Sequence, residues 1–190
     1  RILIFVKIMA AVLNETELKY CADNIELCCT VDLCYDVIIV CTGNASQEKY
    51  WQERLEKGLG VFFPTSSIVL AVHEDWVGGA GNGLGTLYAY KKACLAANAR
   101  DIDLPKMLKD GASVALYHTA GKGTRLAPLP GSENNNKPGV QLPSQVELSD
   151  GSKVNVSILE AVIKQTGIYA KSRGGRVSVY WGDQVFIPSI

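Results

Sequence analysis

Four short segments rich in apolar and β-branched residues recur along the chain. They cover residues 36–42, 66–75, 112–119 and 176–183. The run at residues 36–42, whose signature residues 66–75 repeat, is typical of a strand that is buried on both faces of a parallel sheet, and the other two segments are also expected as strands. The pattern therefore predicts a sheet whose strands are mostly parallel.

Segments with helical character separate or follow these runs, at residues 44–60, 84–99 and 157–171. Asn44 or Ser46 can cap the first helix, and Ser157 or Asn155 can cap the last. Strands that alternate with helices predict an α/β fold, in which helices cover both faces of the sheet in a three-layer sandwich. In such sheets, ligands bind beyond the carboxyl ends of the strands.

Two polar segments marked by glycine or proline are the predicted flexible parts of the chain, at residues 98–111 and 129–139. Neither resembles a linker between domains, so we expect one α/β domain over residues 1–190. Within it, residues 1–110 form an N-terminal strand–helix extension. Residues 111–190 carry the motifs that suggest chemistry.

The charge balance and hydropathy restrict the possible partners. The chain has 19 basic and 19 acidic residues, and its formal net charge is zero. Nucleic-acid binding requires a basic excess or stripe, so we expect no nucleic-acid partner. No apolar span of about 18 residues occurs, so we expect no membrane partner. The apolar stretch at residues 1–13 is interrupted by Lys7, and we interpret it as a buried strand or helix.

The cysteines form no Cys-x-x-Cys pair, and they lie at Cys21, Cys28, Cys29, Cys34, Cys41 and Cys94. Only His73 and His118 could supplement them, so the sequence predicts no zinc site. Cys41 and Cys94 lie in apolar segments, as buried free thiols do. A reducing, cytoplasmic location is therefore expected.

The most informative stretch is HTAGKGTRLAPLPGSENNNKPGVQLP, at residues 118–143. Gly121 and Gly123 let the backbone turn sharply and let N–H groups approach an anion closely. The stretch is neither a P-loop nor a dinucleotide fingerprint, because the required Ser or Thr and the third glycine are missing. A plain strand-to-helix turn would also use glycines, but Arg125 and Lys137 favour a phosphate site.

This stretch resembles the signature of the sugar nucleotidyltransferases, or nucleoside-diphosphate-sugar pyrophosphorylases. The resemblance rests on AGKGTRLAPL at residues 120–129, on the Lys137-Pro138 pair, and on the Gly-Asp pair in VSVYWGDQVF. It implies a Rossmann-like nucleotide-diphospho-sugar transferase fold, present here in part. It also implies an enzyme that transfers a nucleotidyl group from a nucleoside triphosphate to a sugar 1-phosphate with Mg²⁺, releasing pyrophosphate. The implied nucleotide is UTP or GTP.

The resemblance further implies a role for each matching residue. Five consecutive residues would contact the nucleotide and its phosphates: Ala120, Gly121, Lys122, Gly123 and Thr124. Arg125 would bind the pyrophosphate leaving group, Lys137 the α-phosphate region, and Asp183 the Mg²⁺ ion. A guanidinium can hold two phosphate oxygens at once. Cations, a metal ion and backbone donors suffice for this reaction without a covalent nucleophile.

The order of the motifs along the chain is compatible with more than one function. A second glycine loop at residues 78–85 precedes the motif, as in fucose-1-phosphate guanylyltransferases and fucokinase-type pyrophosphorylases, which the layout resembles. That loop could bind phosphate at a helix N-terminus or allow close helix packing. The family would continue past Ile190 with sugar-binding strands and a further aspartate. We expect the N-terminal part of a longer enzyme or, alternatively, a non-catalytic relative that serves as a binding or assembly module in a larger complex.

Other side chains have simpler interpretations. His118 could act as a general base, but a packed or hydrogen-bonded histidine fits the end of a strand equally well. Trp51, Trp76 and Trp181 are expected as core or rim aromatics. Residues 90–92 are expected on a solvated helix face.

Overall fold

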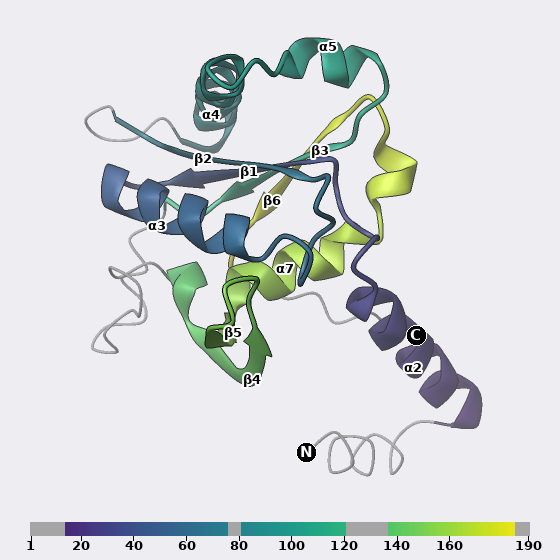
Figure 1. Cartoon of the computed structure of the whole chain (residues 1–190). Coiled ribbons are helices and arrows are strands. Elements are labelled where there is room, and N and C mark those ends of the chain that lie inside the picture. Colours follow the sequence, from purple (N-terminus) through teal and green to yellow (C-terminus); the bar gives the residue numbers. More distant parts are fainter. Residues whose placement is uncertain (1–13, 76–80, 121–136, 185–190) are drawn as a thin grey trace.

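A four-stranded sheet lies between two layers of helices in the part of the chain that the structure describes (Figure 1). The structure is a computed structural model, and it describes residues 14–75, 81–120 and 137–184. All four strands are parallel, in the order β2-β1-β3-β6. Their bounds are β1 (Val37–Thr42), β2 (Ile68–His73), β3 (Val114–His118) and β6 (Val177–Trp181). The prediction of an α/β fold with a parallel sheet is confirmed.

β1 lies in the middle of the sheet, and its whole length is buried. Ile39 of β1 is paired with Leu70 of β2 on one side and with Leu116 of β3 on the other. This position explains the unbroken apolar run, because side chains on both faces of a central strand pack against helices. β6 pairs with β3 and is less buried.

One face of the sheet is covered by α3 (Ala45–Lys57) and α7 (Ile158–Gly167), and we call it the α3/α7 face. Asn44 caps α3 by accepting the N–H of Gln47 at 2.9 Å. Ser157 caps α7 in a capping box with the glutamate at the third helical position. Each cap is one of the two predicted residues. Large aromatic side chains are fully buried on this face: Tyr35, Trp51, Phe63 and Tyr117.

The opposite face is covered by α4 (Gly81–Asn98) and α5 (Leu104–Lys109), and we call it the α4/α5 face. Buried alanines on α4 pack against the strands: Ala89, Ala93 and Ala97. The segment at residues 98–111, expected to be flexible, instead contains α5. Asp103 caps this helix through the N–H of Lys106, and Leu104 is fully buried.

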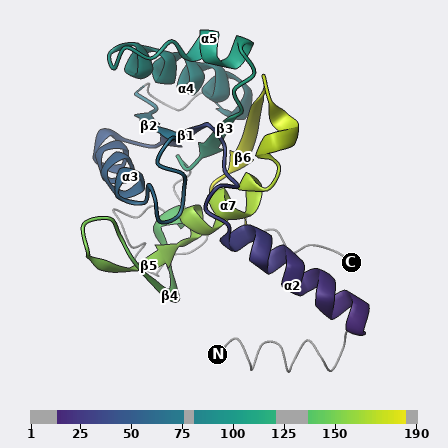
Figure 2. The ribbon, with the colours of Figure 1, turned by 45° about the vertical axis from the view of Figure 1, so that its right-hand side comes forward.

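Other described elements lie outside these three layers. α2 (Glu15–Cys29) extends away from the sheet and contacts α7 (Figure 2). A 3-10 turn, η2 (Lys137–Gly139), precedes a hairpin of β4 (Gln141–Glu147) and β5 (Lys153–Ser157), and another, η3 (Ala170–Arg173), follows α7. No described helix is both long and apolar enough to cross a membrane.

Several side-chain predictions can be compared with the structure. Trp51 lies in the core, whereas Trp181 is 47% exposed at the sheet rim. Cys41 is buried and Cys94 is half-buried, and both thiols are free. Trp76, residues 1–13 and most of residues 129–139 lie outside the described residues.

Candidate functional site

The carboxyl ends of the four parallel strands meet at one edge of the sheet, which we call the carboxyl edge. Chemistry-bearing or small residues follow each strand there: Gly43 and Asn44 after β1, Glu74 and Asp75 after β2, Thr119 and Ala120 after β3, and Gly182 and Asp183 after β6. Ligands of open α/β sheets bind at such edges. The carboxyl edge is therefore the candidate functional site.

Ala120 and Asp183 leave the sheet from neighbouring strands. β3 and β6 are paired, and the N–H of Gly182 continues the ladder by donating to the His118 carbonyl at 2.9 Å. On the other side of β3, Thr119 donates its N–H to the Cys41 carbonyl at 2.8 Å. The structure thus brings together the first predicted nucleotide contact and the predicted magnesium ligand, and both are half-buried.

Close backbone packing fixes the spacing of these strand ends. A Cβ atom at Gly182 would lie 2.7 Å from Thr119 Cγ2 and 2.9 Å from Leu159 Cδ1. A Cβ atom at Gly43 would lie 3.3 Å from the Ala120 carbonyl oxygen. Contacts this short leave little space for a larger residue. Gly43 was not predicted as a site residue, although its position directly after the most apolar run was the available signal.

The remaining predicted site residues are described only in part. Lys137 begins η2, which contacts α7, and the N–H of Ile158 donates to the Val140 carbonyl at 3.0 Å. The backbone of Lys137 is therefore held near the first turn of α7. The other predicted loop residues lie outside the described part of the chain: Gly121, Lys122, Gly123, Thr124 and Arg125.

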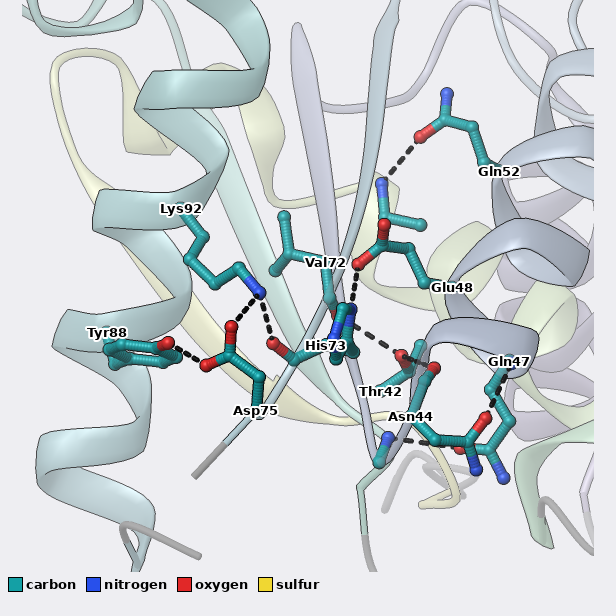
Figure 3. Close-up of polar contacts among 12 residues, drawn as sticks. Thr42, Asn44, Gln47, Glu48, Gln52, Val72, His73, Asp75, Tyr88 and Lys92 are labelled. Atoms are coloured by element: carbon teal, nitrogen blue, oxygen red, sulfur yellow. Dashed lines mark hydrogen bonds and ion pairs between the residues drawn. The ribbon is translucent and has the colours of Figure 1, made fainter. Parts of the chain in front are cut away.

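The loop after β1 is held by side chains of α3 and by the neighbouring strand (Figure 3). Gly43 donates its N–H to Gln47 Oε1 at 3.0 Å. The Thr42 hydroxyl donates to the Val72 carbonyl at 3.2 Å. These bonds satisfy backbone groups where the ladder ends, so the loop is ordered in advance of any ligand.

A second polar group ties α4 to the end of β2, as Figure 3 shows. The Lys92 ammonium lies 2.9 Å from the His73 carbonyl oxygen and 3.1 Å from Asp75 Oδ2. The Tyr88 hydroxyl also donates to Asp75, and this bond, with that of Lys92, lowers the pKa of the Asp75 carboxyl. Residues 90–92 were expected on a solvated face, and this prediction is wrong for Tyr90, which packs against the core of the α4/α5 face, and for the ammonium group of Lys92. The side chain of His73, at the end of β2, contacts α3 instead, and its Nδ1 lies 2.5 Å from Glu48 Oε2.

Three further side chains converge at the carboxyl edge on its α4 side. Candidate ligand atoms of Cys41, Glu74 and His118 all lie within 4.8 Å of one another. His118 Nε2 lies 2.8 Å from Thr86 Oγ1 of α4, and burial lowers the pKa of this imidazole. Burial, together with the negative charge of Glu74, raises the pKa of the Cys41 thiol to about 12. Sequence spacing gave no sign of this cluster, because strand pairing creates it.

A cavity of about 460 Å³ lies between α3 and the β4–β5 hairpin. Two of its charged lining residues, Arg54 and Lys57, form ion pairs with other elements. Arg54 Nε lies 2.6 Å from Glu160 Oε1, and Lys57 Nζ lies 2.9 Å from Asp150 Oδ2. These pairs connect the hairpin and α7 to α3, so we assign this region a structural role.

Comparisons with known proteins add no relative. No protein-family model matches the sequence, and neither the curated proteins nor the solved structures give a significant match. The α/β class therefore rests on the strands and helices themselves. The likeness to sugar nucleotidyltransferases rests on the sequence motifs.

Proposed function

We propose that the protein transfers a nucleotidyl group from a nucleoside triphosphate to a sugar 1-phosphate, with Mg²⁺, giving a nucleotide sugar and pyrophosphate. We also propose that its sheet is part of a Rossmann-like nucleotide-diphospho-sugar transferase fold. The observation that carries the proposal is the position of Ala120 and Asp183 at adjacent strand ends. Two motifs that are distant in sequence would then face one ligand.

Asp183 has suitable chemistry for magnesium. Mg²⁺ in phosphate-transferring proteins is commonly held by one or two carboxylates, substrate phosphates and water. Asp183 is half-buried and directly follows Gly182, whose backbone is fixed by its bond to β3. When bound, the ion would neutralise charge on the phosphates.

The chain's own groups would position the triphosphate. Backbone N–H groups from Ala120 onward would bind phosphate oxygens, with Gly121 and Gly123 allowing the close approach. Arg125 would hold the departing pyrophosphate with its planar guanidinium. Lys137, whose backbone lies against α7, would bind near the α-phosphate.

The proposed reaction requires no general base from the protein. The attacking oxygen of a sugar 1-phosphate already carries negative charge, so in-line placement and charge neutralisation are the main requirements. We therefore assign no proton transfer to His118. Its imidazole Nε2 contacts Thr86 on the α4 side of the carboxyl edge.

The proposal is tested by running the reaction in reverse. The protein is incubated with Mg²⁺, pyrophosphate and a panel of UDP-, GDP- and ADP-sugars, and nucleoside triphosphate is measured. We expect UTP or GTP to form from at least one UDP- or GDP-sugar. A folded sample that forms no triphosphate from any of them contradicts the enzyme proposal.

Calorimetric titration of the same sample with Mg²⁺ and UTP or GTP separates the alternatives. Binding without turnover would support a non-catalytic binding module. If neither nucleotide binds, the carboxyl edge is not a nucleotide site.

A further inference from the structure

We propose that Cys41, Glu74 and His118 form a binding site for a transition-metal ion of the zinc class. The site lies at the carboxyl edge, between the sheet and the first turns of α4. The observation behind it is that a thiol of β1, an imidazole of β3 and a carboxylate directly after β2 offer ligand atoms within 4.8 Å of one another. The inference is independent of nucleotidyl transfer.

Strand register explains why these side chains meet. Cys41 of β1 is directly paired with His118 of β3. Cys41 belongs to the core that packs on α4, and side chains two residues apart point to the same face. Leu116 and Val72 lie in that core, so His118 and Glu74 continue the same face at the ends of β3 and β2. The contact between His118 and Thr86 of α4 agrees with this placement.

The distances suit a single small ion. Ligand atoms around tetrahedral Zn²⁺ are about 3.3–3.8 Å apart, given bonds of about 2.0–2.3 Å. Cys41 Sγ and Glu74 Oε1 are 3.9 Å apart without an ion. Every pair of the three ligand atoms lies within 4.8 Å, so reaching the tetrahedral spacing would shorten each pair by at most about 1.5 Å.

The donor set selects the class of metal. Thiolate and imidazole favour Zn²⁺ and similar transition metals, whereas Mg²⁺ prefers oxygen ligands in an octahedral arrangement. Three protein ligands leave the fourth tetrahedral position open, as in zinc sites that bind water or a substrate group. This site is therefore chemically different from the proposed magnesium ligand Asp183.

One contact orients the imidazole of the proposed site. Thr86 Oγ1 lies 2.8 Å from His118 Nε2. Such outer contacts orient metal-binding imidazoles. On binding, the ion would have to displace the proton of the buried Cys41 thiol, whose pKa is raised to about 12, and release it to solvent as the sulfur–metal bond forms.

Cobalt provides a direct test, because thiolate-bound Co²⁺ has a charge-transfer band in the near ultraviolet and tetrahedral Co²⁺ absorbs in the visible. The reduced chain is titrated anaerobically with Co²⁺ and then with Zn²⁺. We expect both signals to saturate at one Co²⁺ per chain and to disappear as Zn²⁺ displaces it. Absence of a thiolate band at saturating Co²⁺ would overturn the proposal.

The variant Cys41→Ser should lose the thiolate band, whereas the matched control Cys94→Ser should keep it. A band that persists in Cys41→Ser would assign the metal to other cysteines and contradict the site. Glu74→Gln and His118→Gln provide a second test should Cys41→Ser fail to fold. Each should weaken Zn²⁺ binding by more than the roughly 10–100-fold that follows loss of an outer partner. Unchanged affinity in both folded variants would also refute the site.

Discussion

The α3/α7 face packs large aromatic side chains against the sheet, whereas the α4/α5 face packs alanines. Trp51 and Tyr117 belong to the first, whereas α4 contributes Ala89 and Ala93 to a second core made mainly of aliphatic strand residues. Aromatic side chains bury more apolar area than alanines, so each removes more surface from water. The comparison suggests that single residues of the α3/α7 face contribute most to stability.

The polar groups of the two faces differ in how deeply they are buried. On the α3/α7 face, Glu160 is fully buried and receives two hydrogen bonds from Arg54, at 2.6 and 3.0 Å. On the α4 side, Glu74 and His118 are half-buried at the carboxyl edge. We infer that polar groups on the first face serve the fold, and that those at the edge are available to ligands.

The largest expected effect on stability comes from Trp51→Ala. Removing a fully buried indole should lower the free energy of unfolding by about 3–5 kcal/mol, measured by urea denaturation. Trp51→Phe should cost much less, because Nε1 finds no hydrogen-bond partner among the described residues. Equal losses in the two variants would show that the core relaxes around this position.

The next largest effect on stability concerns the buried ion pair between Arg54 and Glu160. Glu160→Ala should lower the free energy of unfolding by about 3 kcal/mol, because Arg54 would stay largely buried without its carboxylate. Loss of the capping box on α7 adds to this. The control Asp150→Ala removes an exposed pair with Lys57 and two exposed hydrogen bonds from Ser152, and it should lower stability less. Similar losses in both variants would contradict the assigned difference in burial.

A smaller effect depends on pH. Burial is the main cause that raises the pKa of Cys34, on the α3/α7 face, from 9.0 to about 11. The neutral folded thiol therefore stabilises the protein fully below pH 9.0, and this contribution is lost as the pH rises to about 11. Cys34→Ala should reduce the alkaline loss of unfolding free energy by about 1–2 kcal/mol. If the unfolding free energy of the wild type and of Cys34→Ala depends on pH in the same way, the Cys34 thiol is exposed to solvent in the folded protein.

The last prediction compares one glycine on each face, and its smallest expected effect is at Gly83. Gly83→Ala in α4 should stabilise the protein by about 0.5–1 kcal/mol, because a Cβ atom there meets nothing within 4 Å. The same change at Gly167 of α7 should destabilise it, since the new Cβ would lie 2.3 Å from the Leu33 carbonyl oxygen. Thermal unfolding of both variants measures this contrast. Shifts in the same direction would contradict the different packing of the two helices.

Hydrophobic patterning predicts the four parallel strands, of which β1, β2 and β3 are buried and β6 is partly exposed, and two helix caps, because these features depend on local sequence. It misses α2, which extends away from the sheet, and the β4–β5 hairpin, whose strands are largely exposed. Neither has a strong periodic signal, and Pro143 within β4 argues against a strand. The cluster of Cys41, Glu74 and His118 is also invisible in the sequence, because only the register between strands brings it together.

Turnover by Asp183→Asn tests most directly whether the carboxyl edge is the site of nucleotidyl transfer. Triphosphate formation from the preferred nucleotide sugar is followed in the wild type, in Asp183→Asn and in the matched control Asp150→Asn on the hairpin. We predict that Asp183→Asn folds as stably as the wild type and loses turnover by at least about 100-fold, whereas the control retains it. Unchanged turnover in a folded Asp183→Asn would place the magnesium site elsewhere and contradict the account.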